Sequence, residues 1–300
     1  MTLSADSTIG LIAGWGRFPI SVAQKLRAQG HDVVCVAIRG HASTELESIC
    51  TDTFWSGVGR FGAHVRFFRR HGVSDVTMAG KLFKHEILYS GSLLWRHRPD
   101  WTCLKTFGPS LLGRQRDARD DSLLMSVIRT YDQHDMTVRS ATELVPELLV
   151  TDGVWTHRDV TVAQRHDIDV GWKVAKAMGG LDVGQAVAVK DGTVIAVEAI
   201  EGTDACVERA GLLCRRGGWT LVKVSKPKQD MRFDVPTIGT QTVQNVANAG
   251  GRAIVVEADR TILLNADATI ALADRLGVAI VAMNQASADS AGVTSTLQAA

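Results

Sequence analysis

The sequence predicts an α/β protein of two domains, an N-terminal Rossmann-like domain with a parallel sheet and a C-terminal mixed α/β domain. Three observations support this fold class. The first half alternates short apolar runs with amphipathic segments, which is the order typical of parallel sheets. The second half contains a strong hairpin signal, and residues 140–162 between the halves lose hydrophobic periodicity. We expect the first domain over residues 1–142, a linker over 143–162 and the second domain over 163–300.

The first half indicates alternating strands and helices. Buried strands are expected at residues 8–13, 32–38 and 75–78, and helices at 20–29 and 61–71. This βαβαβ order implies a parallel, doubly wound sheet. Residues 84–113 mix aromatic and basic side chains without a clean period, so we expect an extended loop or short helices there. A helix at 122–132 and a strand at 137–139 follow.

The second half shows a different order of elements. The dipeptide Asp191-Gly192 lies between two segments with period-two alternation and favours a type I′ hairpin turn, because both residues accept positive φ angles. Helices are expected at 163–178, 203–213, 240–249 and 266–276, and strands at 185–190, 193–200, 220–224, 253–256 and 278–282.

Charge and cysteine content limit the function classes. The 33 basic and 32 acidic side chains nearly cancel, so the chain lacks the strong positive field of a dedicated nucleic-acid binder. Residues 60–119 nevertheless contain twelve Lys or Arg against four Asp or Glu, which favours an anionic partner. The five scattered cysteines form no Cys-x-x-Cys pair, as expected in a reducing cytoplasm. No apolar run approaches the roughly 20 residues of a membrane span, so any membrane contact should be peripheral.

A glycine turn follows the first expected strand. Gly14 and Gly16 would let backbone N–H groups approach a phosphate at the start of the next helix, where Pro19 suits the first turn. The dinucleotide fingerprint lacks its third glycine here, and Arg39 occupies the place of the acidic ribose ligand. NAD is therefore disfavoured, whereas NADP remains an alternative, as does a tight turn that binds no ligand.

Two other features of the first half have open interpretations. Asp120 and Asp121 could cap a helix or face a cation or a ribose as a carboxylate pair. Basic and aromatic side chains alternate over residues 94–98, with Trp101 and Phe107 close behind. This stretch would suit contact with anionic lipid, and an ordinary solvated surface is the alternative.

The densest acidic grouping lies in the second half. Glu198, Glu201 and Asp204 follow a hairpin strand, and residues 226–239 form a charged segment with two prolines after another strand. Within that segment, Asp230 and Asp234 lie four residues apart with Arg232 between them. Such a group can hold a hard cation while the guanidinium neutralises a diphosphate, although a surface ion-pair network would have the same pattern. Thr237 and Gly239 would begin the next helix and offer N–H donors to a phosphate.

These segments resemble the LpxI family of UDP-2,3-diacylglucosamine pyrophosphatases. The specific matches in the second half are residues 182–185, 197–205 and 226–239. The first half matches more loosely, through residues 10–14, Gly16, Pro19, 79–80 and 120–121. The sequence departs from the family at four positions, where it has Trp15, Arg17, Arg119 and Asp259; the family usually has Gly at the last two.

The resemblance implies a hydrolase that uses Mg²⁺ to release UMP and 2,3-diacylglucosamine 1-phosphate (lipid X) for lipid A synthesis. The first domain would bind the nucleotide and the second the lipid sugar. Asp234 is expected to be essential, either as a metal ligand or in orienting water, and Asp230 is the other expected ligand. The expected catalytic residues are Asp234, Asp230, Arg232, Glu201, Asp204 and Lys226. The expected substrate-binding residues are Gly14, Gly16, Pro19, Gly80, Lys81, Asp120, Asp121, Gln185, Gln229, Thr237 and Gly239.

The expected partner is a nucleotide-lipid at the cytoplasmic surface of the inner membrane, with no nucleic acid. The sequence leaves open whether the protein forms a homodimer. Two alternatives remain: an NADP-dependent oxidoreductase, and a noncatalytic protein that binds a nucleotide-lipid or RNA through residues 60–119.

Overall fold

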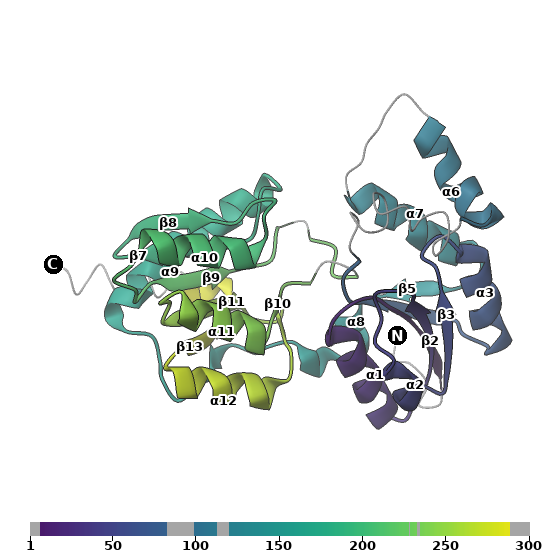
Figure 1. Ribbon diagram of the computed structural model, residues 1–300, viewed down its shortest axis with the longest axis horizontal. Coiled ribbons are helices and arrows are strands. Elements are labelled where there is room, and N and C mark those ends of the chain that lie inside the picture. The colour runs from purple at the N-terminus through teal and green to yellow at the C-terminus, as the bar shows by residue number, and fades with distance from the viewer. Residues whose placement is uncertain (1–6, 83–98, 113–119, 228, 233–234, 289–300) are drawn as a thin grey trace. The chain divides into compact units, whose positions relative to one another are not determined.

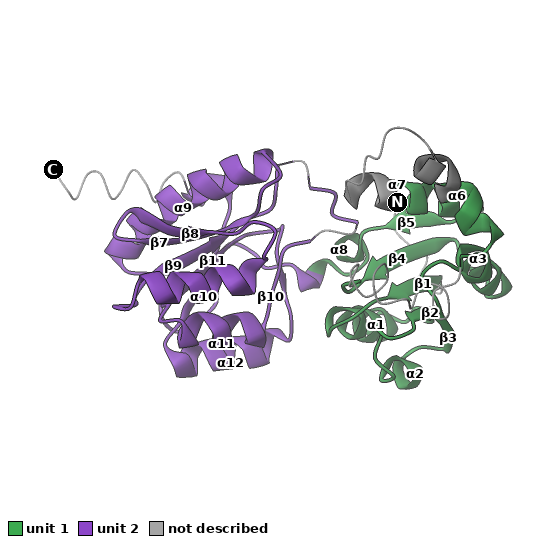
Figure 2. Cartoon of the chain, turned by 45° about the horizontal axis from the view of Figure 1, so that its top comes forward, with its two compact units in different colours: residues 1–146 green, residues 147–300 purple. Residues whose placement is uncertain are grey.

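The computed structural model describes residues 7–82, 99–112, 120–227, 229–232 and 235–288, with the side chains of 107–124 outside the description (Figure 1). The chain forms two compact units, Met1–Pro146 and Glu147–Ala300 (Figure 2). Their boundary falls within the segment expected as a linker. The α/β class is confirmed, with a parallel sheet in unit 1 and a mixed sheet in unit 2.

Unit 1 is built on a five-stranded parallel sheet with the order β3-β2-β1-β4-β5. The strands are β1 (Thr8–Ala13), β2 (Asp32–Ile38), β3 (Asp52–Ser56), β4 (Asp75–Ala79) and β5 (Thr137–Arg139). The helices are α1 (Phe18–Ala28), α2 (Leu46–Ile49), α3 (Phe61–Arg70), α6 (Trp101–Leu112), α7 (Asp120–Asp132) and α8 (Ala141–Leu144). Because β1 lies between β2 and β4, the chain reverses its direction of strand addition at the β1–β4 pair, where doubly wound folds bind ligands.

One strand of unit 1 was missed by the sequence analysis. Asp52–Ser56 forms β3, so residues 75–78 belong to the fourth strand and not to the third. β3 is an edge strand, and only its last residue is buried, so it lacks the apolar run that marks β1 and β2. Helix α6 lies in the stretch expected to be a loop or short helices.

Unit 2 contains a six-stranded mixed sheet with the order β6-β13-β11-β9-β7-β8 and a separate two-stranded sheet, β10–β12. The strands are β6 (Gly153–Val154), β7 (Ala186–Lys190), β8 (Thr193–Val197), β9 (Thr220–Lys223), β10 (Thr237–Ile238), β11 (Ala253–Glu257), β12 (Ile262–Leu263) and β13 (Ala279–Met283). β9, β11 and β13 are parallel, and β7 is antiparallel to both β8 and β9.

Helices cover both faces of the large sheet of unit 2 (Figure 2). They are α9 (Val162–Gly180), α10 (Thr203–Leu213), α11 (Thr240–Asn248) and α12 (Ala266–Leu276), and a short 3₁₀ turn covers Pro146–Leu148. On one face, Ile168 and Trp172 of α9 pack with Val187 and Val222. On the other face, α10, α11 and α12 pack against a second apolar cluster. Two buried faces explain why β9 and β11 are apolar without alternation.

The hairpin prediction is confirmed. Asp191 and Gly192 have φ angles of 50° and 73°, both positive, as a type I′ turn requires. The Gly192 N–H donates to Asp167 Oδ1 at 2.7 Å, which fastens the turn to α9. Asp167 is almost fully buried, and this burial raises its pKa.

Unit 1 contains a buried polar pair between α3 and α7. His64 Nε2 donates to the Gly57 carbonyl at 3.1 Å, and the Tyr131 hydroxyl donates to His64 Nδ1 at 3.3 Å. This arrangement satisfies both ring nitrogens of a neutral imidazole. Burial lowers the pKa of His64 from its ordinary value of 6.5 to about 4.

The buried imidazole should make stability depend on pH in one window. Between pH 6.5 and about 4, this histidine is protonated in the unfolded chain but not in the folded protein. The free energy of unfolding therefore falls as the pH falls. The loss should total roughly 3 kcal/mol. Urea unfolding across this window should give a shallower pH slope for His64→Asn than for the parent, and equal slopes would contradict the assignment.

Candidate active site

Polar side chains gather at one edge of the large sheet of unit 2. β8, β9 and β11 end at this edge and β7 begins there, because β7 is antiparallel to its neighbours. The residues at these positions are Gln185, Glu198, Lys223 and Glu257. Strand ends of parallel sheets are common positions for binding residues. The structure thus brings polar groups from four strands to one edge, and three of them are charged.

A hydrogen-bonded chain connects three of these strands. The Glu198 carboxylate is buried and accepts from the Gln185 N–H at 3.2 Å and the Thr203 hydroxyl at 2.7 Å. Lys223 Nζ donates to the same Thr203 oxygen and to the Thr237 carbonyl, both at 3.2 Å. A Cβ on Gly184 would lie 2.0 Å from the Glu198 carbonyl oxygen, so only glycine allows this approach. The buried acid and the buried base are therefore joined through one threonine.

A second network fixes the segment that follows β9. Both Glu257 carboxylate oxygens accept from Lys176 Nζ at 2.7 Å. One of them also accepts from the Ser225 N–H at 2.8 Å and the Ser225 hydroxyl at 2.6 Å. Lys176 in turn donates to the Ser225 carbonyl at 3.1 Å. Glu257 therefore fixes the position of Ser225, the residue at which the segment after β9 starts.

The segment is held further along by amide side chains. Gln229 Oε1 accepts from the Lys226 N–H at 2.7 Å, and Gln229 Nε2 donates to Gln185 Oε1 at 3.3 Å. Lys226 Nζ reaches Asp182 Oδ1 at 2.6 Å. The structure thus joins Gln185, Gln229 and Lys226, three of the residues singled out in the sequence.

Asp230 and Arg232 form a close ion pair. The Arg232 guanidinium contacts both Asp230 oxygens, at 2.6 to 3.1 Å, and the Arg232 N–H donates to Asp230 Oδ1 at 3.0 Å. These hydrogen bonds from Arg232 lower the pKa of Asp230, so its carboxylate stays ionised at neutral pH. Asp234 lies outside the described residues.

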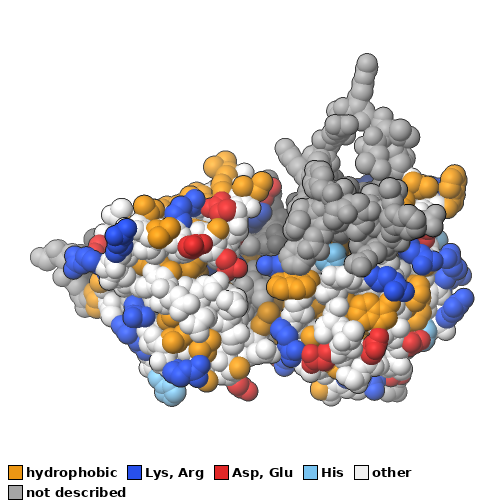
Figure 3. Space-filling model, viewed as in Figure 1, with side chains coloured by type: hydrophobic (Ala, Val, Ile, Leu, Met, Phe, Trp, Pro, Cys, Tyr) orange, Lys and Arg blue, Asp and Glu red, His pale blue; other side chains and the backbone are white. Residues whose placement is uncertain are grey.

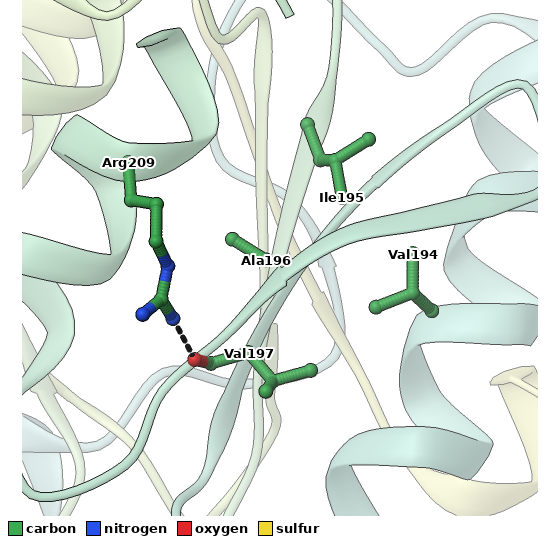
Figure 4. Close-up of a pocket in the computed structure, with 5 residues that line it drawn as sticks. All are labelled: Val194, Ile195, Ala196, Val197 and Arg209. Atoms are coloured by element: carbon green, nitrogen blue, oxygen red, sulfur yellow. Dashed lines mark hydrogen bonds between the residues drawn. The ribbon is translucent and has the colours of Figure 1, made fainter. Parts of the chain in front are cut away.

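Glu201 and Asp204 have other partners. Glu201 pairs with Arg209 at 2.9 Å, and Asp204 Oδ1 accepts from Asn245 Nδ2 at 2.9 Å. Arg209 also donates to the Val197 carbonyl at the rim of an open depression of about 350 Å³ along β8 (Figure 4). The other lining residues are Val194, Ile195 and Ala196, so this depression offers little for binding a charged ligand.

Gly239 lies at the start of a helix, as expected, whereas Thr237 lies in the short strand that precedes it. Thr237 belongs to β10, and Gly239 is the N-cap of α11 with no side-chain hydrogen bond to the cap. Because Lys223 Nζ donates to the Thr237 carbonyl, the N-terminus of α11 lies near this lysine. Helix N-termini and ammonium groups both favour anions.

The expected glycines of unit 1 meet at the β1–β4 switch point. The Gly14 N–H donates to the Ala79 carbonyl at 2.8 Å. This N–H group is therefore used within the fold and does not point toward a phosphate. Trp15 and Lys81 form a backbone bridge through two hydrogen bonds, at 2.8 and 3.0 Å. A Cβ on Gly80 would lie 2.8 Å from Gly14, Trp15 and Pro19 atoms. Gly14 and Gly80 therefore allow two loops to cross closely, and Gly16, with φ 104° and open space beside it, remains accessible.

The described residues do not bring together a set of metal ligands. Within the described part of the chain, no three His, Cys, Asp or Glu side chains converge as ligands. Both oxygens of Asp230 contact Arg232, and the Glu257 oxygens are taken by Lys176 and Ser225. Asp120 begins α7, but its side chain and that of Asp121 are outside the description. The described residues alone do not fit a preformed Mg²⁺ site.

Three charged residues of the networks were not predicted from the sequence. Lys223 and Glu257 lie at the ends of apolar strands, and Lys176 lies on the long helix α9. A charge inside an otherwise apolar strand is itself a signal, because an unpaired buried charge is costly. The run Leu221-Val-Lys-Val-Ser225 contains such a lysine.

Comparison with known proteins gives matches over nearly the whole chain. Residues 8–148 match the LpxI N-terminal domain, and residues 151–281 match the LpxI C-terminal domain. The UDP-2,3-diacylglucosamine pyrophosphatase LpxI of Caulobacter vibrioides is 34% identical over 286 residues, 92% of this chain and 97% of that protein. Among solved structures, CobK precorrin-6A reductase covers 98% of this chain and 96% of its own at 13% identity, but the TM-score of 0.30 supports no inference.

The glycine crossing gives a testable prediction. Gly80→Ala places a Cβ against backbone atoms of Gly14 and Trp15 at φ 94°, whereas Gly72→Ala adds one at φ 66° with nothing within 4 Å. Both should destabilise through backbone strain, and Gly80→Ala should cost about 2 kcal/mol more because of the overlap. Thermal unfolding checks this, and equal losses would contradict the close crossing.

Proposed function

This chain belongs to the LpxI family, and we propose that it hydrolyses the diphosphate bridge of UDP-2,3-diacylglucosamine, releasing UMP and 2,3-diacylglucosamine 1-phosphate (lipid X) for lipid A biosynthesis. The observation that carries the proposal is the match to both LpxI domains together with a curated pyrophosphatase that the chain covers almost completely. The match does not favour an NADP-dependent oxidoreductase or a noncatalytic binding protein.

The reaction sets requirements that the residues of unit 2 can meet. A water oxygen attacks one phosphorus, the bond from that phosphorus to the bridging oxygen breaks, and the bridging oxygen leaves with the other phosphate. Negative charge grows on the phosphate oxygens as this happens, so catalysis depends mostly on positioning and on nearby positive charge. A site for this reaction needs fixed cations and a group that directs water.

Lys223 is the strongest candidate for the fixed cation. The residue is buried at the end of β9, and its ammonium group donates to oxygens of Thr203 and Thr237. These contacts hold the ammonium group at the sheet edge, where positive charge would stabilise an incoming phosphate. The N-terminus of α11 adds N–H donors nearby, and Lys226 and Arg232 add charge from the segment after β9.

Asp234 is proposed to orient the attacking water and accept its proton. This role rests on its place in the Arg-x-Asp-x-Pro-Thr-Ile-Gly run, which ends at the start of α11. Asp230 is ionised and holds Arg232 in place, so it would orient a guanidinium toward the diphosphate. A general base typically contributes roughly 10²- to 10⁴-fold to the rate.

We also propose that turnover requires Mg²⁺. Mg²⁺ commonly binds through one or two carboxylates together with substrate phosphate oxygens, so an incomplete protein site such as this one is no obstacle. When bound, the ion would neutralise diphosphate charge. Asp234 and Asp230 are the carboxylates proposed to hold it, which for Asp230 requires sharing its oxygens with Arg232.

The proposed substrate carries two acyl chains, so it would reside in a membrane. We therefore propose a cytoplasmic enzyme in peripheral contact with the inner membrane. Among the helices that the structure describes, none is long and apolar enough to cross a bilayer.

One prediction of the proposed function concerns Asp234 and the metal. Asp234→Asn should lower kcat for UMP release by roughly 10²- to 10⁴-fold, because it removes the proton acceptor. Asp267→Asn, at an exposed position of α12, should leave kcat unchanged. Excess EDTA should stop turnover by the parent, and added Mg²⁺ should restore it. Near-normal UMP release by Asp234→Asn would refute its role, and activity in EDTA would refute the metal requirement.

Another prediction of the proposed function concerns Lys223. Lys223→Met keeps the apolar stem and removes the charge, so kcat should fall by about 100-fold, the usual scale for losing one charge-stabilising group. Lys173→Met removes an exposed lysine of α9 that pairs with Asp169 and serves as the matched control. Circular dichroism and thermal unfolding check that both variants fold. A folded Lys223→Met enzyme with parental kcat would rule out this lysine as the catalytic cation.

A further inference from the structure

The first turns of α6 present two large apolar side chains to solvent. Trp101 is 79% exposed and Leu104 48% exposed, and their spacing of three places them on one face of the helix. The opposite face is fixed, because Thr106 Oγ1 lies 3.0 Å from Thr130 Oγ1 on α7. The exposed ring and leucine therefore belong to the outward face of a docked helix.

The Asp100 side chain connects α6 to α3 through hydrogen bonds to both helices. One carboxylate oxygen accepts from the Ala63 N–H in the first turn of α3 at 3.2 Å, and the other accepts from the Cys103 N–H in the first turn of α6 at 3.0 Å. The Asp100 N–H donates to the Gly59 carbonyl at 3.0 Å. Both oxygens of this acidic side chain are thus directed at backbone amides, where helix N-termini favour negative charge.

The surface around Trp101 and Leu104 is basic. Neither α3 nor α6 contains an Asp or Glu, and exposed bases lie on both helices: Arg66, Arg69, Arg70 and Lys105. We name these four bases together with Trp101 and Leu104 the α3–α6 patch. A Cβ on Gly62 would lie 2.7 Å from Thr102 Oγ1 and 3.3 Å from Arg66 Nη1, so Arg66 lies beside the first turn of α6. Figure 3 shows apolar side chains with Lys and Arg side chains directly below them on this side of unit 1.

We propose that the α3–α6 patch binds the anionic surface of a phospholipid bilayer. Trp101 and Leu104 would enter the headgroup level, where indole rings are favoured, and the four bases would contact lipid phosphates. A basic residue near an anionic leaflet contributes only about 1 kcal/mol to binding. The four bases and the two apolar side chains would therefore act together. The inference rests on the proposed function in one respect, since a diacylated substrate gives the protein a reason to meet a membrane.

A second copy of the chain is a poorer occupant. A twofold contact would place the patch against itself, and its four cations would then face four cations with no acid from α3 or α6 between them. A nucleic acid would neutralise the bases but offers no apolar phase for Leu104. The combination of exposed apolar and basic side chains fits lipid best.

Vesicle cosedimentation tests the proposal directly. The parent protein should bind vesicles of equimolar phosphatidylglycerol and phosphatidylcholine, bind pure phosphatidylcholine weakly, and release from the anionic vesicles at high salt. Trp101→Ala combined with Leu104→Ser should weaken anionic binding by about tenfold or more. Arg66→Glu combined with Arg69→Glu should do the same. Leu212→Ser combined with Leu213→Ser, which alters two exposed leucines of α10, is the matched control and should bind as the parent does.

A turnover assay separates this inference from the proposed function. The patch variants should hydrolyse UDP-2,3-diacylglucosamine at the parental rate in mixed nonionic micelles and more slowly in anionic vesicles. No turnover by any form would refute the proposed function and leave vesicle binding as the test of the patch. Equal vesicle binding by parent and patch variants would overturn the inference. It would also be overturned if these variants instead abolished a dimer in analytical ultracentrifugation, or RNA binding, while the parent ignored vesicles.

Discussion

The burial of charge at one edge of the unit 2 sheet is the constraint on which the candidate site depends. Glu198 and Lys223 are each 8% exposed, and the Glu257 side chain is 14% exposed. A buried charge without partners costs several kcal/mol, so each of these groups must be surrounded by donors or acceptors. Thr203, Ser225 and Lys176 supply them. The polar networks therefore fix the first residues of α10 and of the segment after β9.

This constraint anchors an irregular charged segment to the end of the sheet. Residues 225–227 and 229–232 include Lys226, Asp230 and Arg232 and form no helix or strand. They are anchored at Ser225 by Glu257 and at Gln229 by Gln185. A phosphate site requires groups positioned within fractions of an ångström, which strand ends provide and free loops do not. In unit 1 the close crossing at Gly14 and Gly80 has the same effect on the loops after β1 and β4.

Much of the fold could be predicted because periodicity and turn chemistry were clear. The bounds of α10 and α12 agree with the predicted helices, and Asp191-Gly192 specified the hairpin. Strand β3 was missed because an edge strand needs no apolar run. Asp259, where the family usually has glycine, has φ 57°, so a positive φ explains that preference and aspartate tolerates it.

The candidate site was predictable only in part. Gln185, Gln229 and Lys226 were found through the resemblance, and the structure connects them. Lys223 and Glu257 were not predicted, because each is a single charge at the end of a separate strand and belongs to no polar cluster in the sequence. Only the strand order β11-β9-β7-β8 brings those charges to one edge, and periodicity does not specify strand order.

Hydrogen–deuterium exchange of the Asp234→Asn protein, with and without UDP-2,3-diacylglucosamine, tests most directly whether this sheet edge binds the diphosphate. Binding there predicts slower exchange of amides in residues 198–204, 223–232 and 237–243 when the substrate is present. Unchanged exchange in all three segments, with substrate protection confined to unit 1, would contradict the claim.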